Sequence, residues 1–112
     1  MKLIIAFIKP FKVDELKAAV TAVGVTGMSV GDIRGFGRQS GQTEVYRGAE
    51  YEVEFVPKTR VEIAVDDSDV PRVVSAIESA TKTGEIGDGK ILVVPLEDVV
   101  RIRTGERGVD AI

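Results

Sequence analysis

The chain has 112 residues, the size of one domain, and its 44% hydrophobic and 29% charged residues are the balance of an ordinary globular protein. The formal net charge of −3 argues against a general nucleic-acid-binding protein, which normally carries a basic excess. Because the chain has no Cys and no His, thiol chemistry, imidazole catalysis and the usual zinc ligands are excluded, and Mg²⁺ held by oxygen ligands is the natural metal candidate.

The first half of the chain predicts a strand, a helix and a second strand. Leu3 to Ile8 is an apolar run, consistent with a strand buried on both faces. It is too short for a signal peptide or a membrane span, so we expect a cytoplasmic protein that does not insert into a membrane itself. The helix is expected to end at Gly24, before a strand from Met28 to Ile33. The apolar stripe of this helix follows the i, i+3, i+4, i+7 spacing at Leu16, Ala19, Val20 and Val23.

The second half repeats this order. Residues 61–65 alternate between apolar and other side chains, which predicts a strand with one buried face. Residues 67–69 offer helix N-caps, and Pro71 suits a first helical turn. The helical spacing recurs from Val70 to Ile77, Gly84 is expected to end this helix, and residues 91–94 form the following strand.

Strand-helix-strand twice over predicts an α+β fold, the ferredoxin-like split βαβ sandwich, with two helices on one face of an antiparallel sheet. The other face of the sheet is left bare and is expected to be largely apolar. An oligomer that covers this face is therefore the physical expectation.

The link between the two halves, residues 35–58, is rich in glycine and charge. Links of this length are uncommon in compact domains and are usually functional or disordered. Tyr46 and Tyr51 have few apolar neighbours in it, although an ordinary hairpin with common aromatic contacts remains an alternative.

A glycine-rich segment from Gly84 to Lys90 imitates a Walker A loop. Ile91 stands where Ser or Thr should hold magnesium, and the segment follows a helix instead of opening one, so we reject a P-loop. Glycine amides can still form an anion-binding nest, to which Lys90 would add a charge. Arg101 and Arg103, in a strand-like stretch, would project from one face. The alternative is a plain helix-to-strand turn at Gly87 and Gly89, with the two arginines paired to Glu97 and Asp98.

Three segments, in order and spacing, resemble one family, the PII signal-transduction proteins of nitrogen metabolism. GFGRQSGQTEVYRGAEY (35–51) is similar to the start of its T-loop, TGEIGDGKI (83–91) to its B-loop, and RIRTGERGVDAI (101–112) to its C-terminal signature. The resemblance implies a single PII-like domain over 1–112 that assembles as a homotrimer. It places the T-loop at about 37–56, the B-loop at about 82–90 and the C-terminal segment at 101–112. It also favours the phosphate interpretation of the glycine-rich segment.

The resemblance implies sites between subunits for ATP or ADP, with 2-oxoglutarate bound when Mg²⁺ and ATP are present. By position, the phosphates would meet the B-loop of one subunit and the two arginines of its neighbour, and two residues would border the adenine. Gln39 would bind Mg²⁺, and Lys58 would pair with a 2-oxoglutarate carboxylate. The implied ligand residues are Ser29, Gly35, Phe36, Gly37, Arg38, Gln39, Lys58, Ala64, Gly87, Asp88, Gly89, Lys90, Arg101 and Arg103.

The family regulates other proteins through the T-loop. The implied partners are an ammonium transporter of the membrane-channel type, which would recruit the protein to the inner membrane face, and a nucleotidyltransferase acting on this protein or on glutamine synthetase. Arg47 would plug the channel, because a guanidinium can bond several carbonyls at once. Tyr51 matches the uridylylated or adenylylated tyrosine of many members. We expect no enzyme; the alternatives are a slow ATP hydrolase or an adenylate-only energy sensor of the same fold.

Overall fold

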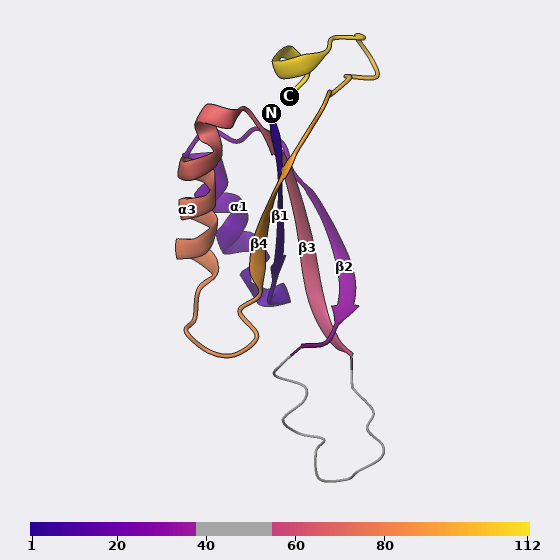
Figure 1. Cartoon of the computed structure of the whole chain (residues 1–112). Helices are drawn as coiled ribbons and strands as arrows, with labels where there is room; N and C mark the ends of the chain where they lie inside the picture. The colour runs from indigo at the N-terminus through magenta and orange to yellow at the C-terminus, as the bar shows by residue number, and fades with distance from the viewer. Residues whose placement is uncertain (38–54) are drawn as a thin grey trace, which may run out of the picture.

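The computed structural model describes residues 1–37 and 55–112 of the chain, which form one sheet with two α-helices (Figure 1). Short 3₁₀ turns, η1, η3 and η4, cover Pro10–Lys12, Asp67–Asp69 and Gly108–Ala111. The main elements in chain order are β1 Lys2–Ile8, α1 Val13–Ala22, β2 Ser29–Gly35, β3 Val56–Val65, α3 Val70–Thr81 and β4 Lys90–Pro95.

The sheet has the strand order β2-β3-β1-β4, and every neighbouring pair is antiparallel. This order, with a helix after the first and third strands, confirms the predicted ferredoxin-like sandwich. β1 lies in the interior of the sheet, where Phe7 is paired with Arg60 of β3 and with Lys90 of β4. The apolar character of β1 follows from this central position.

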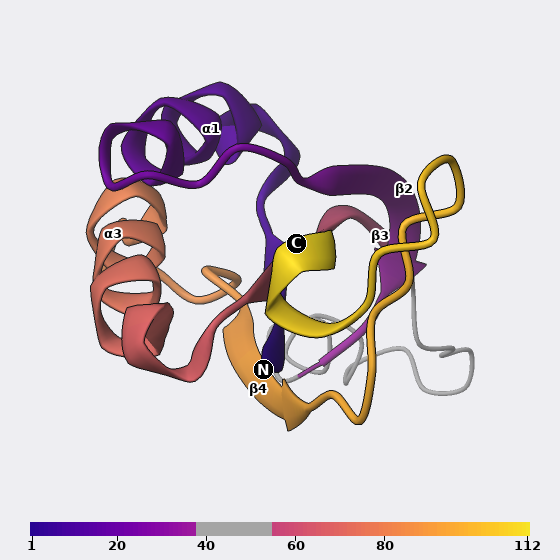
Figure 2. The same ribbon diagram turned by 90° about the horizontal axis from the view of Figure 1, so that it is seen from above.

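Both helices pack on the same face of the sheet, as the view from above shows most clearly (Figure 2). Alternate residues of β1 and β3 face the helices, because side chains in a strand alternate between the two faces. The helices pack against these residues with the apolar stripes that the sequence predicted. The core consists of Ile4, Ala6, Ile8, Leu16, Val20, Val61, Ile63, Val65, Val73 and Ile77.

The helix ends follow the prediction only in part. Gly24 lies just past α1 with a φ of 104°, a left-handed conformation that suits glycine after a helix. The expected end of the second helix at Gly84 is wrong, because α3 ends at Thr81 and Lys82 is already extended. Pro71 does lie in the first turn of α3, but Asp69 makes no side-chain capping bond there. Its carboxylate accepts a hydrogen bond from Arg72 instead, at 3.0 Å.

The helix-free face of the sheet is only partly apolar, which corrects the expectation of a largely apolar surface. β1 and β4 present apolar side chains on it, and Leu92 and Val94 remain 39% and 38% exposed. β3, however, adds a charged row of Lys58, Arg60 and Glu62, in which Arg60 Nε lies 2.7 Å from Glu62 Oε2. No helix in the described part of the chain is long and apolar enough to cross a membrane.

Candidate functional site

The loop from Lys82 to Gly89 connects α3 to β4 at the end of the sheet where the long link begins (Figure 1). It therefore follows a helix and leads into a strand, the order that excluded a P-loop. Gly84, Gly87 and Gly89 have φ angles of 86°, 101° and 96°, so the chain takes a left-handed conformation three times within this loop.

Gly89 lies so close to β1 that no other residue fits. A Cβ at this position would lie 1.6 Å from the carbonyl oxygen of Phe7, far inside the shortest contacts that Cβ atoms make. Because Phe7 is held in the sheet on both sides, the contact fixes where the loop enters β4. The main chain of the loop is thereby held against the end of the interior strand β1.

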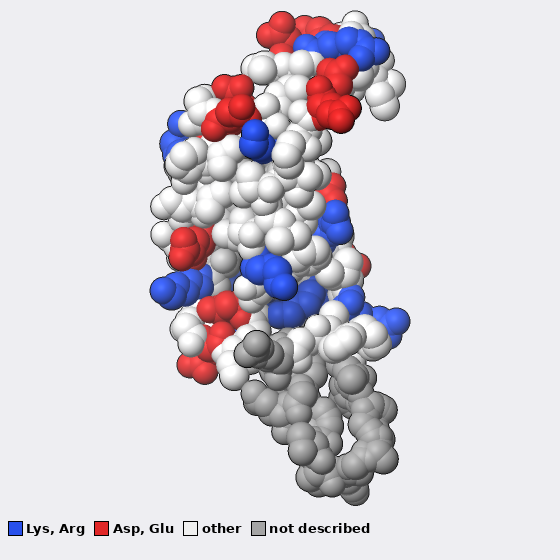
Figure 3. Space-filling view, viewed as in Figure 1, with Lys and Arg blue, Asp and Glu red and all other residues white. Residues whose placement is uncertain are grey.

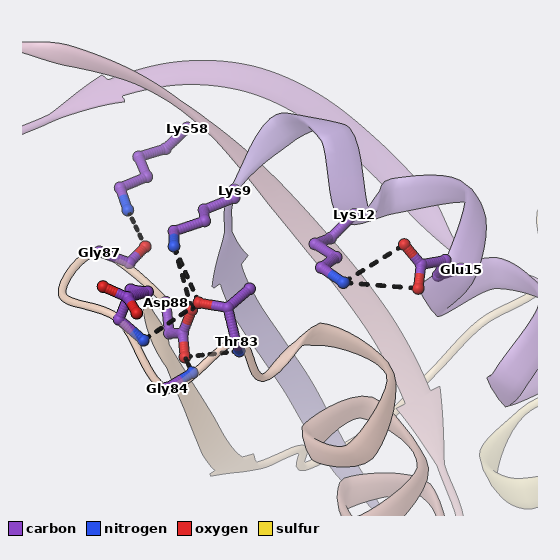
Figure 4. A network of polar contacts seen from close by, with 9 residues as sticks. Lys9, Lys12, Glu15, Lys58, Thr83, Gly84, Gly87 and Asp88 are labelled. Atoms are coloured by element: carbon purple, nitrogen blue, oxygen red, sulfur yellow. Dashed lines mark hydrogen bonds and ion pairs between the residues drawn. The ribbon is translucent and has the colours of Figure 1, made fainter.

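The Asp88 carboxylate closes this loop on itself (Figure 4). It accepts hydrogen bonds from the Thr83 hydroxyl at 2.5 Å and from the Thr83 and Gly84 amides, each at 2.8 Å. Lys9 Nζ lies 3.3 Å from it. The hydrogen bonds from Thr83 come first among the causes that hold the pKa of Asp88 well below its usual range, so this group stays anionic.

A lysine directly after β1 and a lysine of β3 reach the same loop. Lys58 Nζ donates to the carbonyl oxygen of Gly87 at 2.5 Å, and Lys9 Nζ donates to Thr83 Oγ1 at 3.0 Å (Figure 4). Burial, with the nearby charge of Lys9 as a second cause, lowers the pKa of Lys58 below 10.5. An anion placed here would relieve the repulsion between the two lysines.

A cavity of about 960 Å³ lies between this loop, the helix-free face and the start of the long link. Lys and Arg side chains gather over this end of the molecule in the space-filling view (Figure 3). Seven of the fourteen predicted ligand residues line the cavity: Gly35, Phe36, Gly37, Lys58, Gly87, Gly89 and Lys90. Phe7, Ile33, Ile86 and Leu92 complete its wall. The cavity therefore combines cationic groups, glycine main chain and apolar surface, which suits an anion with an apolar part.

Two aromatic rings meet where the long link leaves the sheet. The Phe36 ring stands edge-on to the Phe55 ring, with 5.3 Å between centroids, and the Arg34 guanidinium lies 5.9 Å from the Phe55 centroid. Phe36 also lines the cavity, whereas Phe55 directly precedes β3 in the chain. The contact joins the cavity wall to both ends of the link.

Ser29 and Ala64, the predicted adenine neighbours, lie elsewhere. They line a second cavity, of about 430 Å³, at the opposite end of the sheet, together with Glu62 and the C-terminal residues Ala111 and Ile112. Within one chain, the predicted adenine neighbours and the phosphate-binding residues predicted in the glycine-rich loop are thus at opposite ends of the sheet.

The C-terminal segment lies over the same end as the second cavity (Figure 1). The prediction of a strand-like stretch here is wrong: residues 102–104 form a turn, and Ile102 is 98% exposed. Arg101 and Arg103 therefore do not share the face of a strand. Arg101 Nη1 lies 2.7 Å from Glu106 Oε1, and Arg107, not one of the predicted arginines, takes Asp98 as its partner.

Four predicted functional residues, Arg38, Gln39, Arg47 and Tyr51, lie outside the described residues. Conversely, the prediction missed Lys9 and Thr83. Lys9 could have been suspected as a cation directly after a buried strand. The role of Thr83 depends on the path of the loop, which sequence spacing does not specify.

Comparisons with known proteins agree on one family. The family described as nitrogen regulatory protein P-II matches residues 1–106. The nitrogen regulatory proteins P-II of Azospirillum brasilense, Nostoc punctiforme and Synechocystis are 59%, 57% and 56% identical to this chain, each over the full length of both proteins. A crystal structure of Arabidopsis thaliana PII bound to citrate matches 99% of this chain and 91% of its own, with a TM-score of 0.83 and 38% identity. With its sandwich fold and its glycine-lysine cavity, the chain belongs to the nitrogen regulatory protein P-II family.

Proposed function

We propose that this protein is a non-enzymatic sensor that binds ATP or ADP, takes up Mg²⁺ and 2-oxoglutarate with ATP, and regulates partner proteins through its T-loop. The observation that carries the proposal is the cavity in which Lys58 and Lys90 face left-handed glycines beside the start of that loop. A site of this kind couples ligand chemistry directly to the segment that would contact partners.

The phosphate end of the nucleotide would occupy this cavity. Glycines leave main-chain amides unobstructed, and lysines supply compact positive charge, which is the chemistry that polyphosphates require. Gly89 supports this assignment, because its contact with Phe7 excludes a side chain and keeps the loop main chain at the cavity wall.

The adenine neighbours and the two arginines would come from a second subunit. Ser29 and Ala64 line the second cavity, and the C-terminal segment that carries Arg101 and Arg103 lies over the same end of the sheet. A homotrimer that brings this end of one subunit against the glycine-lysine end of the next would join the two groups into one site. The apolar residues on the helix-free face support such an assembly, since they gain from burial.

Mg²⁺ and 2-oxoglutarate would bind beside the γ-phosphate. Gln39 would supply an oxygen to the metal, and Lys58 would exchange the Gly87 carbonyl for the stronger carboxylate partner. The relative from Arabidopsis is bound to citrate, another polycarboxylate, which supports carboxylate binding in this fold. With Mg²⁺ bound by ATP and effector together, 2-oxoglutarate would bind only when ATP is present.

Hydrolysis of ATP is the less favoured reaction. The glycine-rich loop holds two acids, Glu85 and Asp88, and neither is among the residues that line the cavity. The Asp88 carboxylate already accepts three hydrogen bonds and pairs with Lys9. A carboxylate with a pKa lowered in this way is a poor general base. The site therefore favours binding over turnover.

The readout would be protein docking in the cytoplasm. With ADP or ATP alone, the T-loop would insert Arg47 into an ammonium transporter at the inner membrane face, and ATP with 2-oxoglutarate would withdraw it. Tyr51 would be the target of a nucleotidyltransferase that links the protein to glutamine synthetase regulation. Loss of transporter binding by Arg47→Ala would support this assignment, and full retention would oppose it.

Calorimetric titration of 2-oxoglutarate tests the ligand logic. It is run with ATP and Mg²⁺, with ADP and Mg²⁺, and without nucleotide. Binding in the first arm alone supports the coupled site. If ATP binds but 2-oxoglutarate binds in no arm, the protein is an adenylate-only sensor, and the roles of Gln39 and Lys58 are withdrawn.

Mixing two defective variants tests whether the site is shared between subunits. Lys90→Met disables the loop end and Arg103→Met the opposite end, so neither homotrimer should bind ATP well. Trimers re-formed from a mixture contain interfaces with one intact loop and one intact arginine, and they should regain part of the sites. No recovery in mixed trimers would mean that both groups act within one chain.

A further inference from the structure

The Asp88 side chain does not point into the cavity that is proposed to bind the nucleotide. The loop residues lining that cavity are Ile86, Gly87, Gly89 and Lys90, whereas Asp88 lines a separate cavity of about 380 Å³ beside α3. We propose that Asp88, with Thr83, is a positioning residue that closes the loop and thereby holds the Gly87–Lys90 main chain at the anion cavity. This inference rests on the proposed nucleotide binding and assigns the side chain a role other than ligand contact.

The contacts of Asp88 have the geometry of a clasp. Its Oδ2 accepts from the amides of Thr83 and Gly84, and its Oδ1 accepts from the Thr83 hydroxyl, so both oxygens are bound to the beginning of the same loop. The Glu85 amide in turn donates to Thr83 Oγ1 at 3.1 Å. One carboxylate thus ties the end of the turn to its start.

A clasp is needed because Asp88 stands between two glycines. Gly87 and Gly89 both have left-handed φ angles, and glycine has the widest conformational freedom of any residue. Without a fixed point between them, this segment would populate many conformations. The apparent affinity for an anion falls in proportion to the fraction of molecules that hold the binding conformation.

Lys9 connects the clasp to the sheet. It follows β1 and donates to Thr83 Oγ1 at 3.0 Å, and it forms an ion pair with Asp88 Oδ1 at 3.3 Å. Through Lys9, the clasp is therefore held in place relative to β1, the strand whose Phe7 carbonyl lies next to Gly89. The Asp88 charge is also paired with Lys9, so it opposes phosphate binding less than a free carboxylate would.

A simpler explanation is that Asp88 only balances the charge of the neighbouring lysines. In that case, any acid in the loop would serve, and the Thr83 hydroxyl would not matter. The three hydrogen bonds from Thr83 and Gly84 argue for the geometric role, and the two explanations predict different variants to fail.

Four variants distinguish the geometric role of Asp88 from simple charge balance. Asp88→Asn removes the charge and weakens the clasp, and Thr83→Val keeps the side-chain shape but removes the hydroxyl. Thr83→Ser retains the hydroxyl and should rescue. Glu85→Gln is the matched control: it removes an equal charge from the same loop, and in the described structure the Glu85 carboxylate accepts no hydrogen bond.

Two measurements are made on each variant of the full chain. Amide hydrogen exchange of residues 84–90 without nucleotide reports closure of the loop, and calorimetric titration with ATP reports binding. We expect Asp88→Asn and Thr83→Val to exchange faster in this loop and to bind ATP about tenfold more weakly. Thr83→Ser and Glu85→Gln should stay within about twofold of the unaltered protein, with exchange in β1 and β3 unchanged in all four.

The inference is overturned if Asp88→Asn and Thr83→Val show unaltered loop exchange and affinity, or if Glu85→Gln is as impaired as Asp88→Asn. Should Asp88→Asn fail to fold, the Thr83→Val and Thr83→Ser pair still decides. If the unaltered protein binds no ATP, the proposed function fails, and hydrogen exchange alone decides whether the clasp exists.

Discussion

Replacing Gly89 with Ala tests the closest contact in the candidate site. The added Cβ would lie 1.6 Å from the Phe7 carbonyl oxygen, and the φ of 96° is strained for any side chain. Strain of this kind costs on the order of 1–3 kcal/mol. Because the Phe7 carbonyl belongs to the backbone of an interior strand, the clash cannot be relieved by rotating a side chain.

The clash must therefore open the start of β4. Lys90 pairs with Phe7 and Ile91 with Ala6, so moving the loop outward weakens the first pairs of this ladder. Each backbone hydrogen bond lost contributes about 0.5–1.5 kcal/mol. Together with the strain, we expect Gly89→Ala to lower the free energy of unfolding by about 2–5 kcal/mol, a large part of the 5–15 kcal/mol typical of a domain.

Gly84→Ala provides the matched control. Gly84 lies in the same loop with a φ of 86°, but no described heavy atom lies within 4 Å of where its Cβ would be. This variant carries the backbone strain without the clash, and we expect a loss of about 1 kcal/mol. Urea unfolding of both variants at one protein concentration makes the comparison. If Gly89→Ala is within about 0.5 kcal/mol of Gly84→Ala, the close contact with Phe7 is not rigid and the reasoning is refuted.

Three further predictions concern other parts of the chain. Burial lowers the pKa of Lys58, so the folded protein holds this proton less tightly than the unfolded chain does. The free energy of unfolding of the unaltered protein, relative to that of Lys58→Met, should therefore rise as the pH climbs from the lowered pKa to 10.5. Urea unfolding measures both free energies, and the same pH dependence in the two proteins would contradict the prediction. Hydrogen bonds from the Val99 amide and from Arg107 lower the pKa of Asp98. The stability that ionised Asp98 contributes should therefore be present above pH 3.8 and be lost as the pH falls through the lowered pKa. In acid unfolding, the free energies of unfolding of the unaltered protein and of Asp98→Asn should become equal below that pH. Ile77 is fully buried in the core, and Ile77→Ala should cost about 2–5 kcal/mol in urea unfolding, whereas the exposed Ser79→Ala on the same helix should change stability by less than about 0.5 kcal/mol.

The sheet and helices were predictable because their burial follows simple periods. Val61, Ile63 and Val65 alternate toward the core, and α3 buries Val73 and Ile77 one helical turn apart. The true start of β3 at Val56 was not predictable, because Pro57 and Lys58 are typical of a link. They form a strand through pairing with β2, a non-local cause that a local pattern does not contain.

The C-terminal segment shows how a local pattern misleads. Val100 and Ile102 resemble the alternation of a strand, yet this part of the chain turns, and Gly105 and Gly108 take φ angles of 76° and 70°. One isolated bridge, between Val100 and Arg107, replaces the expected ladder. Turn geometry outweighed hydrophobic alternation because, within residues 1–37 and 55–112, no strand lies beside this segment to extend it into a ladder.

The sequence predicted part of the candidate site's residues but not their arrangement. The residues around Gly87 that were predicted to bind phosphate do gather, whereas Ser29 and Ala64 lie at the far end of the sheet. Lys58 and Ala64 are on the same face of β3, and six residues along a strand span about 20 Å. Only three-dimensional pairing reveals this separation, which is the physical reason to look for the rest of the site on another subunit.

Charge at the glycine-lysine cavity explains why an anion belongs there. Lys58 donates to a neutral carbonyl, and burial and the charge of Lys9 lower its pKa, while the charge of Asp88 offsets only part of this effect. A phosphate or carboxylate would replace the neutral acceptor with a charged one and restore the pKa of Lys58 toward its usual value. Anion binding is therefore linked to proton binding at Lys58, and the affinity of the cavity for anions should fall once the pH exceeds the lowered pKa of the free protein.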